Sequence, residues 1–234
     1  MEAEKLTLKE GLSAQESIYG AYEETLRLVM EDIFRRIRSS QKEYEKTHGG
    51  KIAEHLDGRI KEEGSMRDKL AARGLPINAH SALREVTDAV GIRIVCGFRD
   101  DIYANLDCIR SWDQAKIVQE KDYVRHAKGN GYRSYHVILD VEEPYMDVDG
   151  NCPGHFYVEI QLRTIAMDSW AALEHEISYK QGVSGNARLI ETELKRCADE
   201  LASCDVTMQT IRDLIRHENA KSEEESHENT GCRR

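Results

Sequence analysis

The 234-residue sequence has no apolar run that approaches the roughly 18 residues needed to cross a membrane. Its N-terminus, MEAEKLTLKEGL, lacks the apolar stretch of a secretory signal. The chain also lacks a C-x-x-C pair or a zinc-like grouping among its six cysteines, Cys96, Cys108, Cys152, Cys197, Cys204 and Cys232. We therefore expect a cytoplasmic protein with reduced thiols, no membrane association and no metal–thiolate site.

An excess of positive charge is missing as well. The chain has 33 lysine and arginine residues against 43 aspartate and glutamate residues, which gives a formal net charge of −10. Proteins that bind nucleic acid are usually basic, so this balance argues against nucleic acid as a partner. Much of the acidity lies near the end, in HENAKSEEESHEN, which leaves room for a local basic site in the middle of the chain.

Hydrophobic spacing predicts an α+β domain between two helical regions. In the N-terminal helical region, residues 1–50, Ser13 and Glu16 have capping-box spacing and an amphipathic helix continues to about Lys46. In the central domain, residues 51–181, alternating apolar residues predict a mixed β-sheet of about four to five strands flanked by helices. The predicted strands are a short segment in KIAEHLDGRIK, then GIRIVCGF, AKIVQ, SYHVILDVE and FYVEIQLR. Polar residues predict helix starts at Ser65, at Asp100 or Asp101, and at Thr164.

A C-terminal heptad helix is predicted over residues 182–218, followed by an acidic tail, residues 219–234, that we expect to be disordered. The apolar residues of the helix step alternately by four and three: Ile190, Leu194, Cys197, Leu201, Cys204, Met208, Ile211 and Ile215. So narrow a seam favours pairing with another helix, either the N-terminal one or one across subunits. A helix packed on the sheet also fits the pattern.

The predicted strand within residues 156–164, FYVEIQLRT, has two faces of different chemistry. Apolar residues alternate with Glu159, Gln161 and Arg163, so one face suits a core and the other presents a polar row on rigid backbone. Asp88 comes just before the apolar strand GIRIVCGF. A carboxylate at a strand entrance paired with one on a second strand can hold Mg²⁺ between phosphates, although Asp88 alone also fits a helix cap.

Two further stretches concentrate positive charge. GRIKEEGSMRDKL combines the basic residues Arg59, Lys61 and Lys69 with a predicted helix start at Ser65, and the N-terminus of a helix favours anions. A solvated charged surface is nevertheless the commoner arrangement for such residues. The second stretch is EKDYVRHAKGNGYRSYH, residues 120–136. It combines the basic residues Lys121, Lys128 and Arg133 with the flat ring of Tyr132, on which a base can stack. An ordinary glycine loop between two strands would also account for the second stretch. Neither contains a generic nucleotide-binding glycine motif.

Together these stretches resemble the synthetase domain of the RelA/SpoT family, and most closely the stand-alone small alarmone synthetases. The blocks are GRIK…S…KL, D-x-x-GIRI-x-C, EKDY…K-x-NGYRS-x-H and VEIQLRT-IAMDSWA-x-LEH, from about Gly58 to Tyr179. The resemblance implies a nucleotidyltransferase-like fold, Mg²⁺ as cofactor and a homotetramer built by the terminal helices. It also implies transfer of the β,γ-pyrophosphate of ATP to the 3′-hydroxyl of GDP or GTP. No His-Asp dipeptide is present, so we expect no hydrolase activity.

The resemblance also implies a role for each matching residue. Glu159 would act as base and Mg²⁺ ligand, with Asp88 as the second ligand. Arg59 and Arg93 would sandwich the adenine, and the ATP phosphates would be bound by Lys61, Ser65 and Lys69. Tyr132 would stack on guanine. The remaining acceptor-side residues would be Lys121, Lys128, Asn130, Arg133, His136, Gln161, Arg163 and Glu174. Arg133 could equally brace the loop, and a structural role stays open for His136 and Glu174. We expect Asp168 and Trp170 to be structural or peripheral.

Other functions stay open from the sequence. One alternative is a toxin-like synthetase that pyrophosphorylates tRNA 3′ ends, which would need a basic track beside the site. Another is a nucleotide sensor without turnover. The order of preference among GDP, GTP and GMP is not encoded in any pattern. His55-Leu56-Asp57 stands where related enzymes with an effector pocket tend to carry an aromatic residue and a threonine. Its aspartate would repel a polyphosphate effector, so we expect little or no activation by pppGpp.

Overall fold

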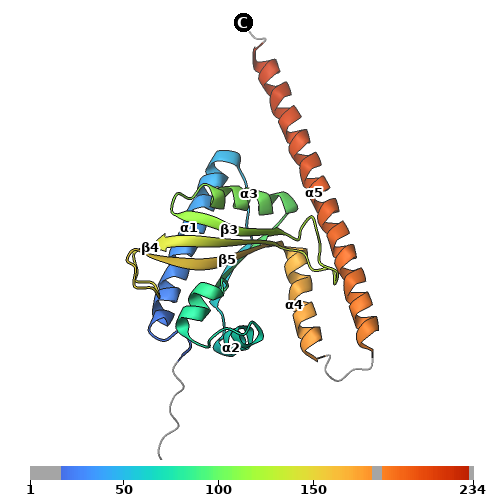
Figure 1. Ribbon diagram of the computed structural model, residues 1–234. Helices are drawn as coiled ribbons and strands as arrows, with labels where there is room; N and C mark the ends of the chain where they lie inside the picture. The colour runs from blue at the N-terminus through green and yellow to red at the C-terminus, as the bar shows by residue number, and fades with distance from the viewer. Residues whose placement is uncertain (1–16, 181–185, 232–234) are drawn as a thin grey trace, which may run out of the picture.

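The structure, a computed structural model, describes residues 17–180 and 186–231 (Figure 1). Ser13 and Glu16, the predicted capping box, lie outside these residues. The helices are α1 (Tyr22–His48), α2 (Glu63–Ala72), the short π-helix η1 (Ser81–Glu85), α3 (Arg99–Arg110), α4 (Ile165–Lys180) and α5 (Ala187–Gly231). The strands are β1 (His55–Ile60), β2 (Val90–Cys96), β3 (Ala115–Asp122), β4 (Tyr135–Glu143) and β5 (Gly154–Thr164).

The five strands form one mixed sheet in the order β1-β2-β5-β4-β3. β2 and β5 run parallel, whereas the other neighbouring strands are antiparallel. β5 therefore lies at the centre, between the strand that follows Asp88 and the strand that carries His136. The predicted α+β class and the mixed sheet of about four to five strands are both confirmed.

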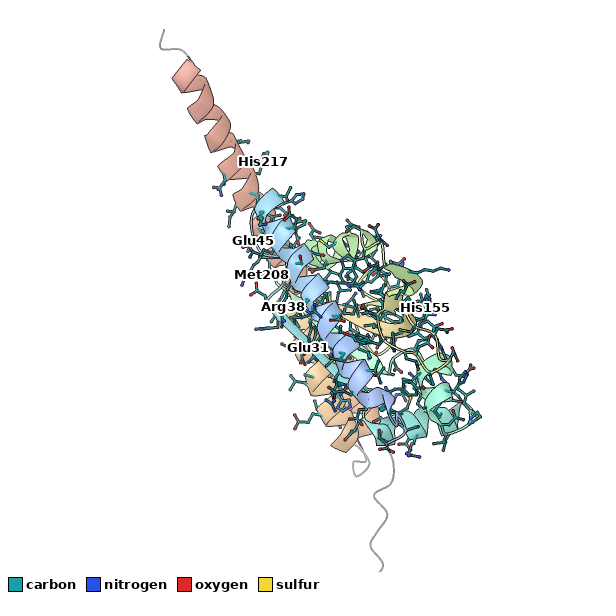
Figure 2. The ribbon with its side chains drawn as sticks, turned by 90° about the vertical axis from the view of Figure 1, so that its left-hand side faces the viewer. Glu31, Arg38, Glu45, His155, Met208 and His217 are labelled. Atoms are coloured by element: carbon teal, nitrogen blue, oxygen red, sulfur yellow. The ribbon has the colours of Figure 1, made fainter. Side chains whose placement is uncertain are left out.

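One face of the sheet is buried beneath α1 and α3. The residues of β5 that alternate toward this face are at most 5% exposed: Phe156, Val158, Ile160 and Leu162. Burying each such side chain contributes roughly 1.5–3 kcal/mol, so this apolar stripe determines which face of β5 turns inward. The outer side of α1 is charged, with Glu31, Arg38 and Glu45 exposed along it (Figure 2).

The starts of the helices differ in part from those predicted. α2 begins at Glu63 with Glu62 at its N-cap, so Ser65 lies inside the first turn and does not cap the helix. Asp101 does act at the start of α3, but from the third helical position, where its Oδ2 accepts a hydrogen bond from the backbone N–H of Phe98 at 3.1 Å. Thr164 is confirmed as a cap, because its hydroxyl oxygen accepts from the N–H of Met167 at 3.2 Å.

The long helix α5 packs beside α4 and then extends well past the rest of the molecule (Figure 1). It continues to Gly231, through much of the tail that we expected to be disordered; residues 219–231 contain four glutamates and one lysine, which favour helices, and no proline. His217 lies on the projecting part (Figure 2). None of the helices in the described part of the chain is long and apolar enough to span a bilayer.

The predicted heptad seam of α5 is only partly covered. Leu194 and Leu201 pack against the cluster of Trp170 and Ala198, so the first half of the helix uses the seam together with an adjacent small residue. In the second half the seam is open to solvent: Met208, Ile211 and Ile215 are 53%, 47% and 52% exposed. The seam therefore does not pack on the sheet along its whole length.

Candidate active site

A cleft of about 490 Å³ lies on the uncovered face of the sheet, where α4 forms one wall. Its lining includes the following residues from the predicted set: Arg59, Lys61, Asp88, Arg93, Tyr132, Glu159, Gln161, Arg163 and Glu174. Residues more than a hundred positions apart thus meet in one hollow. Its volume is in the range of small-molecule sites, roughly 300–1,000 Å³.

Strand pairing explains how the charged side chains come together. Asp57 of β1 lies opposite Arg93 of β2, and Arg93 lies opposite Gln161 of β5. Residues opposite each other on neighbouring strands point to the same face, so the polar row continues across three strands. Gly91, which pairs with Glu159, has no side chain and leaves space beside this carboxylate.

The carboxylate of Glu159 is tightly held. Its Oε1 lies 2.9 Å from Nδ1 of His136, and its Oε2 accepts a hydrogen bond from the Gln161 amide at 2.9 Å. Burial acts to raise the pKa of Glu159, but the hydrogen bonds from His136 and Gln161 outweigh it and lower this pKa to about 2. Glu159 is therefore ionised at neutral pH.

Asp88 is held by two lysines. Its Oδ2 lies 3.1 Å from Nζ of Lys61 and 2.6 Å from Nζ of Lys69, and the latter ammonium also helps to lower the pKa of Glu159. The other oxygen of Asp88, Oδ1, is buried and has no hydrogen-bond partner in the described part of the chain. A buried carboxylate oxygen without a partner is costly, so Asp88 is prepared for a cationic ligand.

The donor set agrees with Mg²⁺ better than with a metal held by protein alone. No group of three or more histidine, cysteine, aspartate or glutamate side chains suited to a metal occurs among the residues that the structure describes. Mg²⁺ is commonly held by one or two carboxylates, with substrate phosphates and water completing its shell. Asp88 and Glu159, both lining the cleft, provide such a pair.

Asp168, which we expected to be structural or peripheral, belongs to the cleft's ion-pair network. Its Oδ1 lies 3.1 Å from Nη1 of Arg93 and 3.0 Å from Nη1 of Arg163. Arg93 also pairs with Asp57 at 3.1 Å. Asp168 does not itself line the cleft, so these ion pairs agree with the structural role expected for it. The junction of β5 and α4 brings the first turn of α4 back beside Arg163.

The loop between β3 and β4 presents Tyr132 to the cleft. Asn130 Oδ1 accepts a hydrogen bond from the Tyr132 N–H at 3.1 Å, so this amide shapes the turn. Nζ of Lys128 lies 4.8 Å from the centre of the Tyr132 ring. Behind the loop, Trp170 packs near the Tyr132 ring and donates to the Leu194 carbonyl at 2.8 Å, so the expected structural role of Trp170 is supported.

Arg133 points away from the cleft, in agreement with the bracing role considered above and not with phosphate binding. It donates to the Val124 carbonyl at 3.3 Å and pairs with Asp199 of α5 at 3.5 Å. It lines a separate hollow between the loop and α5, together with Arg99. Successive residues in an extended segment face opposite sides, which is why Tyr132 and Arg133 diverge.

Several predicted residues lie beside the cleft without lining it. Lys121 lies opposite His136 in the β3–β4 pair and so points to the same face. Ser65 is exposed in the first turn of α2.

Asp57, by contrast, which we had considered only for an effector pocket, lines the cleft itself.

Comparison with known proteins agrees with this site. A family model described as a region found in RelA / SpoT proteins matches residues 58–184. The GTP pyrophosphokinase YwaC of Bacillus subtilis is 36% identical over 170 residues, which cover 73% of this chain and 79% of that protein. The GTP pyrophosphokinase YjbM of the same organism is 33% identical over 179 residues, 76% of this chain and 80% of that protein.

Solved structures give the same result. The small alarmone synthetase 1 from Bacillus subtilis bound to its product pppGpp superposes with a TM-score of 0.71 and 29% sequence identity, covering 82% of this chain and 95% of that chain. The family match includes every predicted block and all the residues that line the cleft except Asp57. The chain therefore belongs to the RelA/SpoT family.

Proposed function

We propose that this protein is a GTP pyrophosphokinase that makes ppGpp or pppGpp. It transfers the β,γ-pyrophosphate of ATP to the 3′-hydroxyl of GDP or GTP and releases AMP, without hydrolysing the product. The observation that carries the proposal is the pair of carboxylates, Asp88 and Glu159, within a cleft lined by cations. The names of YwaC and YjbM describe the same activity in two relatives.

The cations of the cleft suit the donor nucleotide. Phosphoryl transfer depends mainly on positioning and on neutralising phosphate charge. Lys61 and Lys69, now paired with Asp88, would bind the ATP phosphates together with Ser65. Arg59 and Arg93 lie on adjacent strands, and their planar guanidinium groups would hold the adenine between them.

Mg²⁺ would be held by Asp88 and Glu159. Bound there with the ATP phosphates, it would neutralise charge that develops on the transferred group. The unpartnered Oδ1 of Asp88 supports this assignment, because a bare buried carboxylate oxygen needs a partner. Both carboxylates would then be oriented before the acceptor arrives.

Glu159 would also take the proton of the 3′-hydroxyl. A carboxyl group whose pKa is about 2 is a weak base, so its contribution comes from its position beside the hydroxyl and not from proton affinity. Tyr132 would stack on the guanine, with Lys121, Lys128 and His136 near the acceptor's phosphates. Gln161, Arg163 and Glu174 complete this side of the cleft.

Assembly through α5 is part of the proposal. The exposed seam of Met208, Ile211 and Ile215 is apolar over nearly two turns, which suits another helix of the same kind. A homotetramer would cover it with a second copy of the chain. The predicted cytoplasmic location fits a protein that works on free nucleotides and stays a prediction.

The test is direct. Purified protein is mixed with γ-labelled ATP, Mg²⁺ and either GDP, GTP or GMP, and the products are separated by chromatography. Label should move to guanosine tetra- or pentaphosphate with the wild type and be lost with Glu159→Gln. Glu142→Gln is the matched control, because Glu142 is an exposed carboxylate on β4 outside the cleft.

Failure has distinct meanings. Product formation that survives Glu159→Gln would contradict the role of this carboxylate but not the activity. No product from the wild type would overturn the activity itself. Label found on tRNA would then favour the toxin-like alternative, and nucleotide binding without turnover would favour a sensor.

A further inference from the structure

We propose that the hydroxyl group of Tyr132, as distinct from its ring, positions Glu159 by holding the imidazole of His136 in a fixed orientation. The inference rests on the proposed role of Glu159 and adds to it a positioning residue on a different element. Tyr132 and Glu159 share no direct contact among those the structure gives. They are joined by His136 on one side and by Arg163 and Gln161 on the other.

These five side chains form a closed ring of hydrogen bonds. On one side, the Tyr132 hydroxyl lies 2.8 Å from Nε2 of His136, whose Nδ1 lies 2.9 Å from Glu159. On the other, Nη2 of Arg163 donates to the Tyr132 oxygen at 2.8 Å and to the Gln161 carbonyl at 2.7 Å. The ring closes at the Gln161 amide, which donates to Glu159 at 2.9 Å.

With a neutral imidazole at His136, the chemistry of the two ends gives each hydrogen bond in this ring one direction. An ionised carboxylate only accepts hydrogen bonds, and a guanidinium only donates them. Nδ1 of His136 must therefore carry the hydrogen that faces Glu159. In the neutral imidazole Nε2 is then an acceptor, so the Tyr132 hydroxyl donates to it while accepting from Arg163. On both sides of the ring, each hydrogen bond is donated in the direction from Arg163 to Glu159.

Removing the Tyr132 hydroxyl interrupts the hydrogen bonds that connect Arg163 to His136. Nε2 of His136 then has no hydrogen-bond partner in the ring, so the imidazole is held through Nδ1 alone and is free to tilt. The hydrogen bond from Nδ1 to Glu159 is then less well directed, and so is the carboxylate. A reacting group that is less well oriented lowers the rate of the chemical step more than it lowers substrate affinity.

The position of the hydroxyl is itself well determined. Tyr132 belongs to the cluster of Trp170, Ala198 and Leu201, which joins its loop to α4 and α5. Tyr123 packs edge-on against both Tyr132 and His136, with ring centres 6.1 and 5.5 Å apart. The surrounding helices thus hold the ring through its apolar surface and leave the hydroxyl for His136.

The test separates the hydroxyl from the ring. Tyr132→Phe keeps the aromatic surface, so KM for GTP should stay within about two-fold while kcat falls about ten-fold. Tyr123→Phe is the matched control, because its hydroxyl has no hydrogen bond among those of the described residues; its kcat should match the wild type. A Tyr132→Phe enzyme with unchanged kcat, or with only KM raised, would overturn the proposal.

A second variant tests the path through His136. In His136→Asn the side-chain amide nitrogen takes the place of Nδ1, and no atom takes the place of Nε2, so the Tyr132 hydroxyl loses its partner. Adding Tyr132→Phe to this background should leave kcat unchanged, since coupled residues are not additive. If the two losses multiply, the hydroxyl acts by another route and the inference is wrong.

A third measurement follows the ring nitrogens of His136 directly. With ¹⁵N-labelled histidine, the ring nitrogens of His136 should report the hydrogen on Nδ1, and His136→Asn identifies its signals. Tyr132→Phe should keep this hydrogen on Nδ1 but shift the signal of Nε2, which loses its hydrogen-bond donor. A wild-type ring with its hydrogen on Nε2 would overturn the proposal, whereas the loss of product from the wild type or its retention by Glu159→Gln would overturn the proposed function or the role of Glu159 instead.

Discussion

The ammonium group of Lys69 lies 2.6 Å from Oδ2 of Asp88. Lys61 approaches the same oxygen at 3.1 Å, so two cations share one oxygen while the other oxygen of Asp88 has no partner in the described part of the chain. In this arrangement substrate phosphates can replace Asp88 as the partner of the two lysines, and a metal ion can replace the lysines as the partner of Asp88. It links the charges that line the cleft to the ligands we propose for it.

We expect Lys69→Met to impair the use of ATP. The variant removes a cation that faces both Asp88 and, through its charge, Glu159, so kcat/KM for ATP should fall roughly 100-fold. Steady-state rates at varied ATP and fixed GTP measure this. Lys42→Met, on the exposed surface of α1, is the control and should behave as the wild type. An unchanged KM for ATP and unchanged kcat would show that Lys69 only neutralises Asp88.

Gly131 should be intolerant of a side chain. Its φ is +94°, and an added Cβ would lie 2.6 Å from the Cβ of Ala198 on α5. Gly131→Ala should therefore push the Tyr132 loop off α5, destabilise the fold by about 1–3 kcal/mol and raise KM for the guanine nucleotide. Gly129→Ala in the same loop is the control, since its Cβ would meet nothing within 4 Å. Urea unfolding and KM for GTP measure the two effects; equal behaviour of both variants would contradict the prediction.

Asp147 should stabilise the turn between β4 and β5. Its carboxylate is 1% exposed, accepts from the N–H groups of Asp149, Asn151 and His155, and pairs with Arg84 at 2.6 Å. Asp147→Asn should cost about 2–3 kcal/mol of unfolding free energy, because it leaves the Arg84 charge poorly paired. Asp149→Asn, which also loses a contact with Arg84 but is 38% exposed, should cost under about 1 kcal/mol.

The contribution of Asp147 should also depend on pH. Burial acts to raise the pKa of Asp147, but the hydrogen bonds from three backbone N–H groups and the Asn151 side chain outweigh it and lower this pKa to about 2. Because the folded pKa is below the unfolded value near 3.8, the ionised form stabilises the fold at neutral pH. That stability should be complete above about pH 4–5 and decline as the pH falls toward 2. Urea midpoints at pH 7 and pH 3 should therefore differ more for the wild type than for Asp147→Asn.

The seam of α5 should control assembly. Ile211→Glu places a charge among exposed apolar side chains, and it should shift the protein to smaller species in sedimentation velocity runs, with the shift greatest at low protein concentration. Thr210→Glu adds the same charge at an exposed polar neighbour and serves as the control. If both variants sediment as the wild type does, α5 is not an assembly surface.

Local patterns were sufficient to predict much of this protein. The alternation in FYVEIQLRT predicted both faces of β5, since a period of two follows from strand geometry alone. The steps of four and three predicted the long helix α5 for the same kind of reason. Most residues of the cleft, including Asp88 and Glu159, were identified from short blocks whose order is written in the chain. The disorder expected after residue 218 was the main error, and there helix propensity was underestimated.

The polar contacts of the site depend on the tertiary structure. Glu159 meets His136 and Gln161 only because β5 lies between β2 and β4, and no local period encodes the order of strands in a sheet. Asp168 reaches Arg93 only because β2 and β5 are parallel, and Arg133 turns to α5 because the loop packs there. The sequence by itself thus determined which residues are available on each element. The packing of the elements decided which of them are partners, since hydrogen bonds and ion pairs require approach within about 3 Å.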